Sequence, residues 1–222
     1  MLELPKPYYD CDGITIYHAD CRDILPLLPK VDLVLTDPPY GIGFRYGTGY
    51  KDSKNGYIEF LWPILEAAED RAKTLAVFQA AKYARMYSSW FPRDWRLVAI
   101  GKKFGQWMPN FIQYRTDYVL VWGELIEKHE TKAIPRDFFV SSQCANTSPG
   151  ARPDHPCPRP IDTMMFCVDV LSNLESTILD PFMGSGTTLV AAKHLGRRAI
   201  GIEIEEKYCE IAVKRLGQGV LC

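Results

Sequence analysis

The stretch that decides the fold is STILDPFMGSGTTLVAAKHLGRRAIGIEI, residues 176–204. Its two apolar ends, 176–179 and 199–204, are typical of strands, and residues 187–194 between them have a helical pattern. A strand that runs through a glycine-rich turn into a helix and then into another strand is the repeating unit of α/β sheets. The stretch therefore predicts a mostly parallel sheet with helices on both faces.

The same alternation extends over the rest of the chain. Apolar segments bounded by turn residues predict about seven strands: Gly13–His18, Val31–Thr36, Thr74–Gln79, Arg96–Ile100, Asp117–Trp122, Ser176–Leu179 and Ala199–Ile204. Helical patterns are found at Tyr57–Lys73, Ala80–Trp90, Ile161–Asn173, Thr187–His194 and Glu206–Leu216. Pro63 predicts a kink or a later start in the first helix. No helical pattern joins the fourth and fifth strands, which indicates an antiparallel pair at one edge.

Length and composition fit one domain. The 222 residues are 47% hydrophobic and 24% charged, which is typical of a globular protein and excludes a mainly disordered one. No apolar run is long enough to span a membrane, and the first residues lack the pattern of a secretory signal. The seven cysteines are odd in number and none are spaced as C-x-x-C, so neither a disulfide framework nor a metal site is expected. We expect one domain over residues 1–222 in a reducing cytoplasm.

The turn at Asp180–Thr188, DPFMGSGTT, has the chemistry of a ligand loop. Gly184 and Gly186 allow a tight bend and a close approach of backbone to ligand, and the helix after them offers free N–H groups. A P-loop would need a lysine, and a dinucleotide fingerprint would need glycine in place of Leu189. The loop is therefore expected to hold the carboxylate end or the ribose of a nucleoside cofactor. Glu203, at the end of the next strand, can accept both ribose hydroxyls.

A second motif, Asp37-Pro38-Pro39-Tyr40, directly follows the strand at Val31–Thr36. A carboxylate at the C-terminal end of such a strand faces the crevice where α/β proteins bind ligands. The prolines stiffen the backbone and carry no N–H, so Asp37 and the Pro38 carbonyl form a rigid pair of acceptors. Such a pair, with the Tyr40 ring for stacking, suits a planar group that carries an amine.

Together the two motifs resemble the amino-methyltransferases of DNA that use S-adenosylmethionine. Their order, DPPY before the glycine loop, resembles the β class of that family, a circular permutation of the common methyltransferase sheet. Asp20-Cys21 is similar to the family's G-D-C/S stretch, residues 155–160 (HPCPRP) to its H-P-T-x-K-P motif, and the ending GIEIEEKYCEIAVKRL to its G-x-E…Y…R-L finish. Ala19 stands where the family usually has glycine, and Cys157 and Arg159 replace its Thr and Lys.

The resemblance implies a Rossmann-like methyltransferase fold with S-adenosylmethionine as cofactor. It implies that Asp20 and Cys21 hold the cofactor adenine and that Arg159 meets a carboxylate with its fork. The residues implied to bind the cofactor are Asp20, Cys21, Asp37, Arg159, Asp180, Phe182, Gly184, Ser185, Gly186, Thr187, Thr188, Glu203 and Ile204. Those implied for catalysis are Asp37, Pro38, Pro39 and Tyr40. A short target-recognition insertion would occupy about residues 123–153.

The implied reaction methylates an exocyclic amine of a base that leaves the stack of double-stranded DNA. Tyr40 would stack on the base, while Asp37 and the Pro38 carbonyl would aim the amine at the sulfonium methyl for one in-line displacement. Asp-Pro-Pro-Tyr is commoner for adenine-N6 in this family and Ser-Pro-Pro-Tyr for cytosine-N4, so adenine is favoured and cytosine-N4 is the alternative.

Other classes fit the motifs less well. Cytosine-C5 methylation would need a Pro-Cys nucleophile, and Pro156-Cys157 lies outside the catalytic strand end. The permuted order disfavours RNA or protein amide methylation. The two intact motifs disfavour a catalytically silent relative that only holds cofactor or DNA.

Residues 41–56, rich in glycine and aromatic side chains, predict a substrate loop over DNA in which rings stack and cations meet phosphate. The candidate DNA-binding residues are Phe44, Arg45, Tyr46, Lys51 and Lys54. An ordinary surface loop with buried tyrosines is the alternative. Residues 41–160 hold 17 Lys+Arg against 12 Asp+Glu, an excess of 17 − 12 = 5 positive charges, which is compatible with a polyanion there. The resemblance further implies a bacterial or phage origin, a homodimer and a restriction endonuclease as partner.

Overall fold

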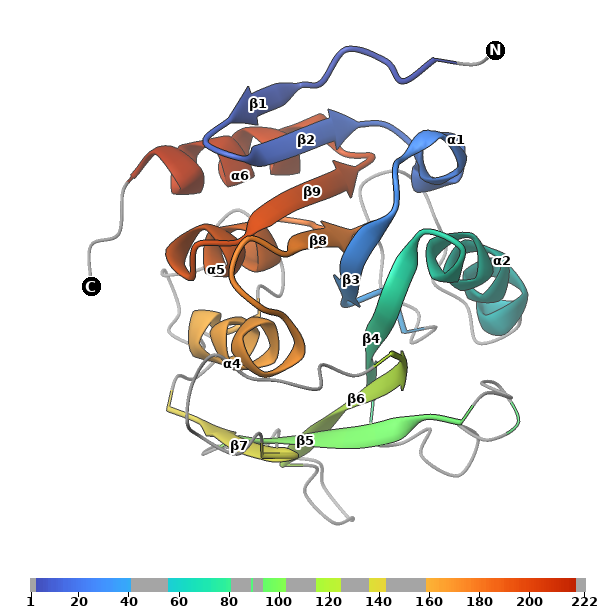
Figure 1. Cartoon of the computed structure of the whole chain (residues 1–222), viewed down its shortest axis with the longest axis vertical. Coiled ribbons are helices and arrows are strands. Elements are labelled where there is room, and N and C mark those ends of the chain that lie inside the picture. Colours follow the sequence, from blue (N-terminus) through green and yellow to red (C-terminus); the bar gives the residue numbers. More distant parts are fainter. Residues whose placement is uncertain are drawn as a thin grey trace.

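The structure, a computed structural model, describes residues 3–40, 56–80, 89, 94–102, 115–124, 136–142 and 159–218. These residues form one nine-stranded sheet in the order β1-β2-β9-β8-β3-β4-β6-β5-β7 (Figure 1). The strands are β1 (Tyr9–Cys11), β2 (Ile14–His18), β3 (Val31–Thr36), β4 (Ala72–Ala80), β5 (Arg96–Lys102), β6 (Thr116–Gly123), β7 (Phe138–Ser141), β8 (Thr177–Asp180) and β9 (Arg198–Glu203). The helices are α1 (Cys21–Ile24), the short 3₁₀ helix η1 (Leu25–Leu27), α2 (Tyr57–Glu69), α4 (Ile161–Leu171), α5 (Thr187–His194) and α6 (Glu206–Gly217).

The centre of the sheet is parallel. Neighbouring strands run parallel from β2 through β9, β8 and β3 to β4, whereas β1 pairs with β2, β4 with β6 and β6 with β5 in the antiparallel sense. The predicted α/β fold, mostly parallel with antiparallel strands, is confirmed, and each of the predicted strands forms. The added strands, β1 and β7, are short and lie at the two edges of the sheet. Such edge strands lack the long apolar run that marks a central strand in a sequence.

Three details differ from expectation. The antiparallel pair β5–β6 forms, but it was wrongly placed at the edge, because β7 adds to β5 in parallel beyond it. The first helix begins at Tyr57 and continues through the exposed Pro63, so a later start is wrong. It ends at Glu69, short of Lys73, because β4 begins at Ala72. A helix was expected over residues 80–90, but Ala80 belongs to β4, so the predicted start is wrong. The rest of that segment lies almost wholly outside the described residues.

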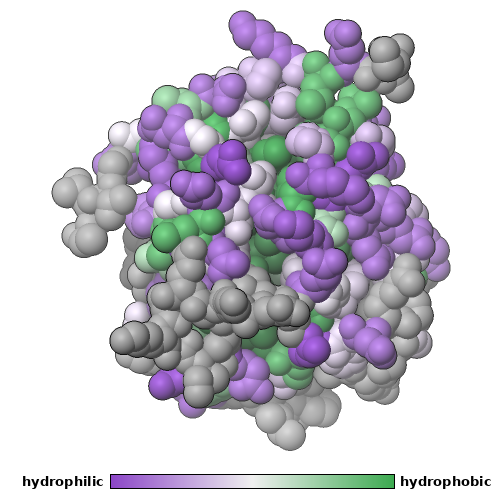
Figure 2. All heavy atoms as spheres, viewed as in Figure 1, coloured by the Kyte–Doolittle hydropathy of each residue, from purple (hydrophilic) through white to green (hydrophobic). Residues whose placement is uncertain are grey.

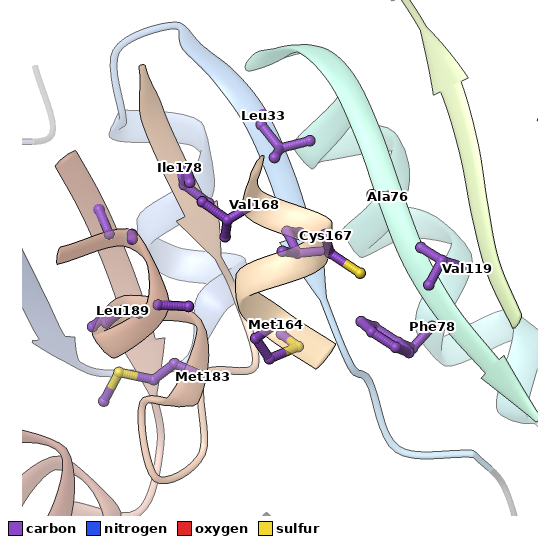
Figure 3. Packing of buried hydrophobic residues seen from close by; sticks show 14 of the residues in the cluster. Leu33, Ala76, Phe78, Val119, Met164, Cys167, Val168, Ile178, Met183 and Leu189 are labelled. Carbon is purple, nitrogen blue, oxygen red and sulfur yellow. The ribbon is translucent and has the colours of Figure 1, made fainter. Parts of the chain in front are cut away.

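Helices cover both faces of the sheet. One buried apolar cluster combines β-strand residues with α4, α5 and α6, and the other combines them with α1, η1 and α2. Figure 3 shows Met164, Cys167 and Val168 of α4 facing Leu33 of β3 and Phe78 of β4. On the face shown in Figure 2, hydrophilic side chains cover most of the described surface. None of the described helices is long and apolar enough to cross a membrane.

Candidate active site

The two sequence motifs meet at the ends of adjacent strands. Strands β3 and β8 pair in parallel, with Val34 opposite Leu179, so both C-terminal ends reach the same edge of the sheet. The Thr36 hydroxyl, on the last residue of β3, donates to Asp180 Oδ1 at 2.8 Å. Asp37 is the next residue in the chain, so the DPPY motif starts beside the first residue of the glycine loop.

The side chain of Asp180 holds the glycine loop in place through hydrogen bonds. Its side chain is buried and accepts hydrogen bonds from the Thr36 hydroxyl, the Thr188 hydroxyl at 2.6 Å and the Phe182 N–H at 3.1 Å. Burial raises the pKa of Asp180 to about 6, and the nearby charge of Asp37 acts in the same direction. Asp180 therefore ties the loop to both β3 and α5.

The loop glycines are required by the backbone. Gly184 and Gly186 have φ values of +50° and +76°, which favour glycine. A Cβ on Gly186 would lie 2.7 Å from the Cβ of Ala212, so α6 packs directly against the loop. Arg215 of α6 holds the residues around Gly186: its Nη1 donates to the Ser185 carbonyl at 2.7 Å and to the hydroxyls of Ser185 and Thr187 at 3.0 Å.

Glu203, the last residue of β9, binds the glycine loop through its side chain. Its Oε2 accepts from the Gly184 N–H and its Oε1 from the Glu205 N–H, both at 2.9 Å. Burial raises the pKa of Glu203 to about 7, against the effect of these two hydrogen bonds. The Glu203 carbonyl accepts from the Ala19 N–H at 3.0 Å, which brings Asp20 to the same edge. The expected ribose acceptor and the segment expected to hold the adenine are thus neighbours.

The remaining residues expected to contact the cofactor differ in exposure. Asp20 caps α1 and accepts from the Arg22 N–H at 2.9 Å and from the Arg22 guanidinium. Cys21 is buried in the core, and that burial raises its thiol pKa to about 12. Phe182 is partly buried beside the Phe60 ring, and Ile204 is half exposed.

The Asp37 side of the site is an ionic network. Arg159 donates from Nε to Asp37 Oδ2 at 2.5 Å and from Nη2 to Asp37 Oδ1 at 2.9 Å. Its Nη1 donates to Asp117 Oδ2, and Lys102 Nζ lies 2.8 Å from that same oxygen. The Tyr40 hydroxyl donates to Asp37 Oδ1 and accepts from Arg159 Nη2. Asp37 thus has two partners, one neutral and one cationic.

Burial and charge set the protonation of this network. Burial raises the pKa of the Tyr40 phenol well above its usual value, so Tyr40 stays a neutral donor. Burial opposes ionisation of Asp117, but the charges of Arg159 and Lys102 hold its pKa below the usual value. Within the motif, Pro38 is buried and Pro39 is partly buried. Arg159, which was expected to bind the cofactor, pairs here with two protein carboxylates, those of Asp37 and Asp117.

Sequence reasoning missed Asp117 and Arg215. Asp117 is a charged residue near the start of an otherwise apolar strand, β6, and this break in the pattern is the one signal for it. Arg215 lies in the last turn of α6, where basic residues are common without any ligand. The candidate DNA-binding residues Phe44, Arg45, Tyr46, Lys51 and Lys54 lie outside the described residues, as does most of 123–153. No cluster that could hold a metal is present among the residues that the structure describes.

The chain is similar to known proteins of one kind. A DNA methylase family model matches residues 112–214. The type II methyltransferase M.HpaI of Haemophilus parainfluenzae is 28% identical over 84% of this chain and 68% of its own length. Among solved structures, the M1.HpyAVI–SAM complex is 24% identical with a TM-score of 0.67, over 91% of this chain and 98% of its own.

The PvuII DNA methyltransferase, which is cytosine-N4-specific, has a TM-score of 0.74 at 17% identity, over 98% of this chain and 91% of its own. These structures share the Rossmann-like fold of methyltransferases, which agrees with the sheet described above. The family match and the type II relative agree with the resemblance seen in the motifs. In its motifs, in the family match and in its type II relatives, the chain is therefore similar to the S-adenosylmethionine-dependent DNA amino-methyltransferases.

Proposed function

We propose that this DNA methyltransferase transfers the methyl group of S-adenosylmethionine to the N6 amine of adenine in double-stranded DNA. The observation that carries the proposal is the position of Asp37, an acceptor at the end of β3, beside the glycine loop that starts at Asp180. A nucleobase amine and a nucleoside cofactor can meet there.

The residues around the loop suit the cofactor. Each Glu203 oxygen accepts one backbone N–H and keeps a lone pair for a ribose hydroxyl. Next to it, Glu205 Oε1 is buried without a hydrogen-bond partner among the described residues, so an acceptor is available for a further donor. The M1.HpyAVI relative, of the same fold, was solved with SAM. Glu203, Gly184 and Asp20 are therefore the proposed cofactor residues, with the loop and Phe182 around them.

The bound cofactor supplies an electrophilic methyl group on a sulfonium. Asp37 and the Pro38 carbonyl accept the two N–H hydrogens of the target amine, which keeps the nitrogen lone pair out of the ring and directed at the methyl carbon. Tyr40, whose hydroxyl binds Asp37 and Arg159, stacks its ring on the flipped base. The amine nitrogen then attacks the methyl carbon in line while the methyl–sulfur bond breaks and leaves a neutral thioether, and the proton that the nitrogen loses passes to Asp37 or to solvent.

Adenine is favoured because the motif begins with aspartate. Cytosine-N4 is the second candidate, since the cytosine-N4-specific PvuII enzyme has the same fold. Both bases present an exocyclic amine next to a ring nitrogen, so the acceptors described above suit either of them. The product therefore has to be identified directly.

The test is methyl transfer from tritiated S-adenosylmethionine to mixed-sequence DNA, followed by digestion to nucleosides and chromatography. We expect N6-methyldeoxyadenosine. Label in N4-methyldeoxycytidine would replace adenine by cytosine, and no label above background would overturn the proposed activity. As a control, Asp37→Ala should lower the rate about 1,000-fold or more, because it removes the acceptor that orients the amine. Its cofactor affinity, measured by calorimetry, should stay within about threefold, because the loop is intact.

Binding to DNA through residues 41–56 also stays a prediction. Charge reversal of Arg45, Lys51 and Lys54 should weaken DNA binding and flatten its dependence on salt, because each lost phosphate contact removes released counterions. An unchanged salt slope would contradict it. The homodimer, the endonuclease partner and the cytoplasmic location are expectations from the family.

A further inference from the structure

All three nitrogens of the Arg159 guanidinium donate hydrogen bonds within the site. The Nε–Nη2 edge makes the paired contact with both oxygens of Asp37, and Nη1 is bound to Asp117. The face of the group lies over the Phe78 ring, with Cζ 4.7 Å from its centroid. Only 16% of the Arg159 side chain is exposed. The planar fork is therefore held at its edges and on one face, and it has little freedom to turn.

The contacts of Arg159 come from parts of the chain that are far apart. Arg159 lies just before α4, Asp37 follows β3, and Asp117 lies near the start of β6. Asp117 reaches the site because β6 lies between β4 and β5, with Asp117 paired to Ala80 and to Ile100. The strand order of the sheet thus supplies the second carboxylate.

Among the residues that the structure describes, the network is balanced in charge. Two carboxylates, of Asp37 and Asp117, face two cations, of Arg159 and Lys102. The Asp117 side chain is 13% exposed and that of Lys102 is 40% exposed, so Lys102 lies at the solvent side of the network. Without Asp117, the Nη1 end of Arg159 would lose its charged partner, and the long side chain could leave Asp37.

Among the described side chains that bind Asp37, Arg159 is the one that holds both carboxylate oxygens. The Tyr40 hydroxyl binds Oδ1 alone, and the Tyr40 ring has a second task in the proposed reaction, which is to stack on the base. Because a paired contact fixes the plane of a carboxylate, Arg159 sets the direction in which Asp37 can accept the target amine.

We infer that Asp117 is a positioning residue for methyl transfer: it holds Nη1 of Arg159, and Arg159 in turn keeps the Asp37 carboxylate directed at the target amine. Asp117 touches neither the base nor the cofactor in this scheme. The inference rests on the proposed amine methylation and adds to it a residue outside both sequence motifs. It predicts that loss of Asp117 slows the chemical step and leaves cofactor binding unchanged.

The test measures the single-turnover rate of tritiated methyl transfer at saturating DNA and cofactor, with cofactor affinity from calorimetry. Asp117→Ala should lower the rate about 30- to 100-fold, the range expected for a misdirected catalytic group. Its cofactor dissociation constant should stay within about threefold of wild type. Asp117→Asn has almost the same shape and keeps one acceptor, so it should lose less and should fold if the alanine variant does not.

The matched control is Asp12→Asn. Asp12 forms an ion pair with Lys193 at 3.0 Å, 64% of its side chain is exposed, and its φ of +51° is one that asparagine tolerates. This variant also removes one carboxylate from an ion pair, so it controls for the change in net charge. Its rate should stay within about twofold of wild type, as expected for an exposed ion pair.

A double-variant cycle separates positioning from general support of the fold. Arg159→Lys keeps the charge and loses the fork, so adding Asp117→Asn to it should cost little further rate. Rate losses that multiply, or a cofactor affinity that falls in step with the rate, would overturn the inference. So would an Asp117→Ala variant within threefold of an active wild type. An inactive wild type, by contrast, would overturn the proposed function itself.

Discussion

The two halves of the site hold their carboxylates in different ways. In the loop half, defined by Asp180, Gly184–Gly186 and Glu203, the carboxylates accept hydrogen bonds from backbone N–H groups and hydroxyls, and burial raises their pKa values. In the arginine half, defined by Asp37, Arg159 and Asp117, the carboxylates are paired with cations. There the pKa of Asp117 falls in spite of its burial.

This difference shows where each half is vulnerable. The loop half is built from one stretch of chain, and its geometry depends on backbone conformation and close packing. The arginine half is assembled from distant segments, and its geometry depends on charge. We therefore expect the loop half to be broken by an added atom and the arginine half by removal of one of its buried charges, and not by removal of the solvent-side Lys102. The following changes test that contrast, from the largest expected effect to the smallest.

Gly186→Ala should destabilise the protein by about 4 kcal/mol, the sum of a left-handed backbone and an overpacked contact. The added Cβ would meet the Cβ of Ala212 at 2.7 Å. Urea denaturation measures the change. Ala212→Gly by itself should cost about 1 kcal/mol as a glycine within a helix. When Ala212→Gly is combined with Gly186→Ala, it should recover part of the lost stability, because it removes the clash. If the losses of stability from the two substitutions simply add, α6 does not press on the loop.

Asp180→Asn should change how stability depends on pH. The pKa of Asp180 in the folded protein is about 6, above its usual value of 3.8, so its contribution to stability is fully present below pH 3.8 and is lost as the pH rises through 6. That loss is about 3 kcal/mol for a shift of this size. The Asp180→Asn variant has no carboxyl group at this position to titrate, so it does not lose this stability. Its unfolding free energy should therefore rise relative to that of the wild type between pH 4.5 and pH 8. A difference independent of pH would contradict the buried setting of Asp180, whose partners among the described residues are neutral.

Cofactor affinity should rise with pH through the titration of Glu203. Its pKa of about 7 means that the carboxylate is mostly protonated below pH 7 and ionised above it. Because the ionised form is the better acceptor for ribose hydroxyls, the dissociation constant should fall about tenfold from pH 6 to pH 8. Calorimetry with S-adenosylmethionine at several pH values measures this. The Glu203→Gln variant should bind S-adenosylmethionine more weakly, and its affinity should depend much less on pH. If the pH dependence persists in this variant, a group other than Glu203 causes it.

Lys102→Met should have the smallest effect. Lys102 is 40% exposed and contacts Asp117 from the solvent side, so its ion pair is screened and should contribute less than about 1 kcal/mol. Thermal unfolding of the variant at low and high salt measures the contribution. A loss much larger than this would mean that the arginine half needs both of its cations, and that the charge of Arg159 alone does not hold Asp117.

The same contrast explains what the sequence could predict. The loop half follows from a continuous stretch, because glycine, aspartate and glutamate at fixed spacing after apolar strands have few other uses. The meeting of Asp37 with the loop also follows, because adjacent parallel strands end at the same edge. The contacts of Arg159 with Asp117 do not follow, since they depend on β6 lying between β4 and β5. The sequence predicts that β6 pairs with β5, but it does not show that β6 also pairs with β4.

Local pattern also failed at particular places. The prediction placed the end of α2 at Lys73, because Ala72 and Lys73 fit a helix as well as a strand. In the structure both residues belong to β4, where Ala72 pairs with Val31 of β3. The contacts of the Tyr40 hydroxyl with Asp37 and Arg159 do not follow from local pattern either, because Arg159 comes from a distant part of the chain.

The pairing of β2 with β9 has a consequence for the synthesis of the protein. Residues 14–18 leave the ribosome early, but their parallel partner, 198–203, and the strand beyond it, 177–180, are made much later. While the chain is growing, the middle of the sheet lacks two strands, and Asp37 exists without the loop opposite it. Methylation competence should therefore arise in one late step, and a nascent chain stalled before residue 177 should be unable to retain the cofactor.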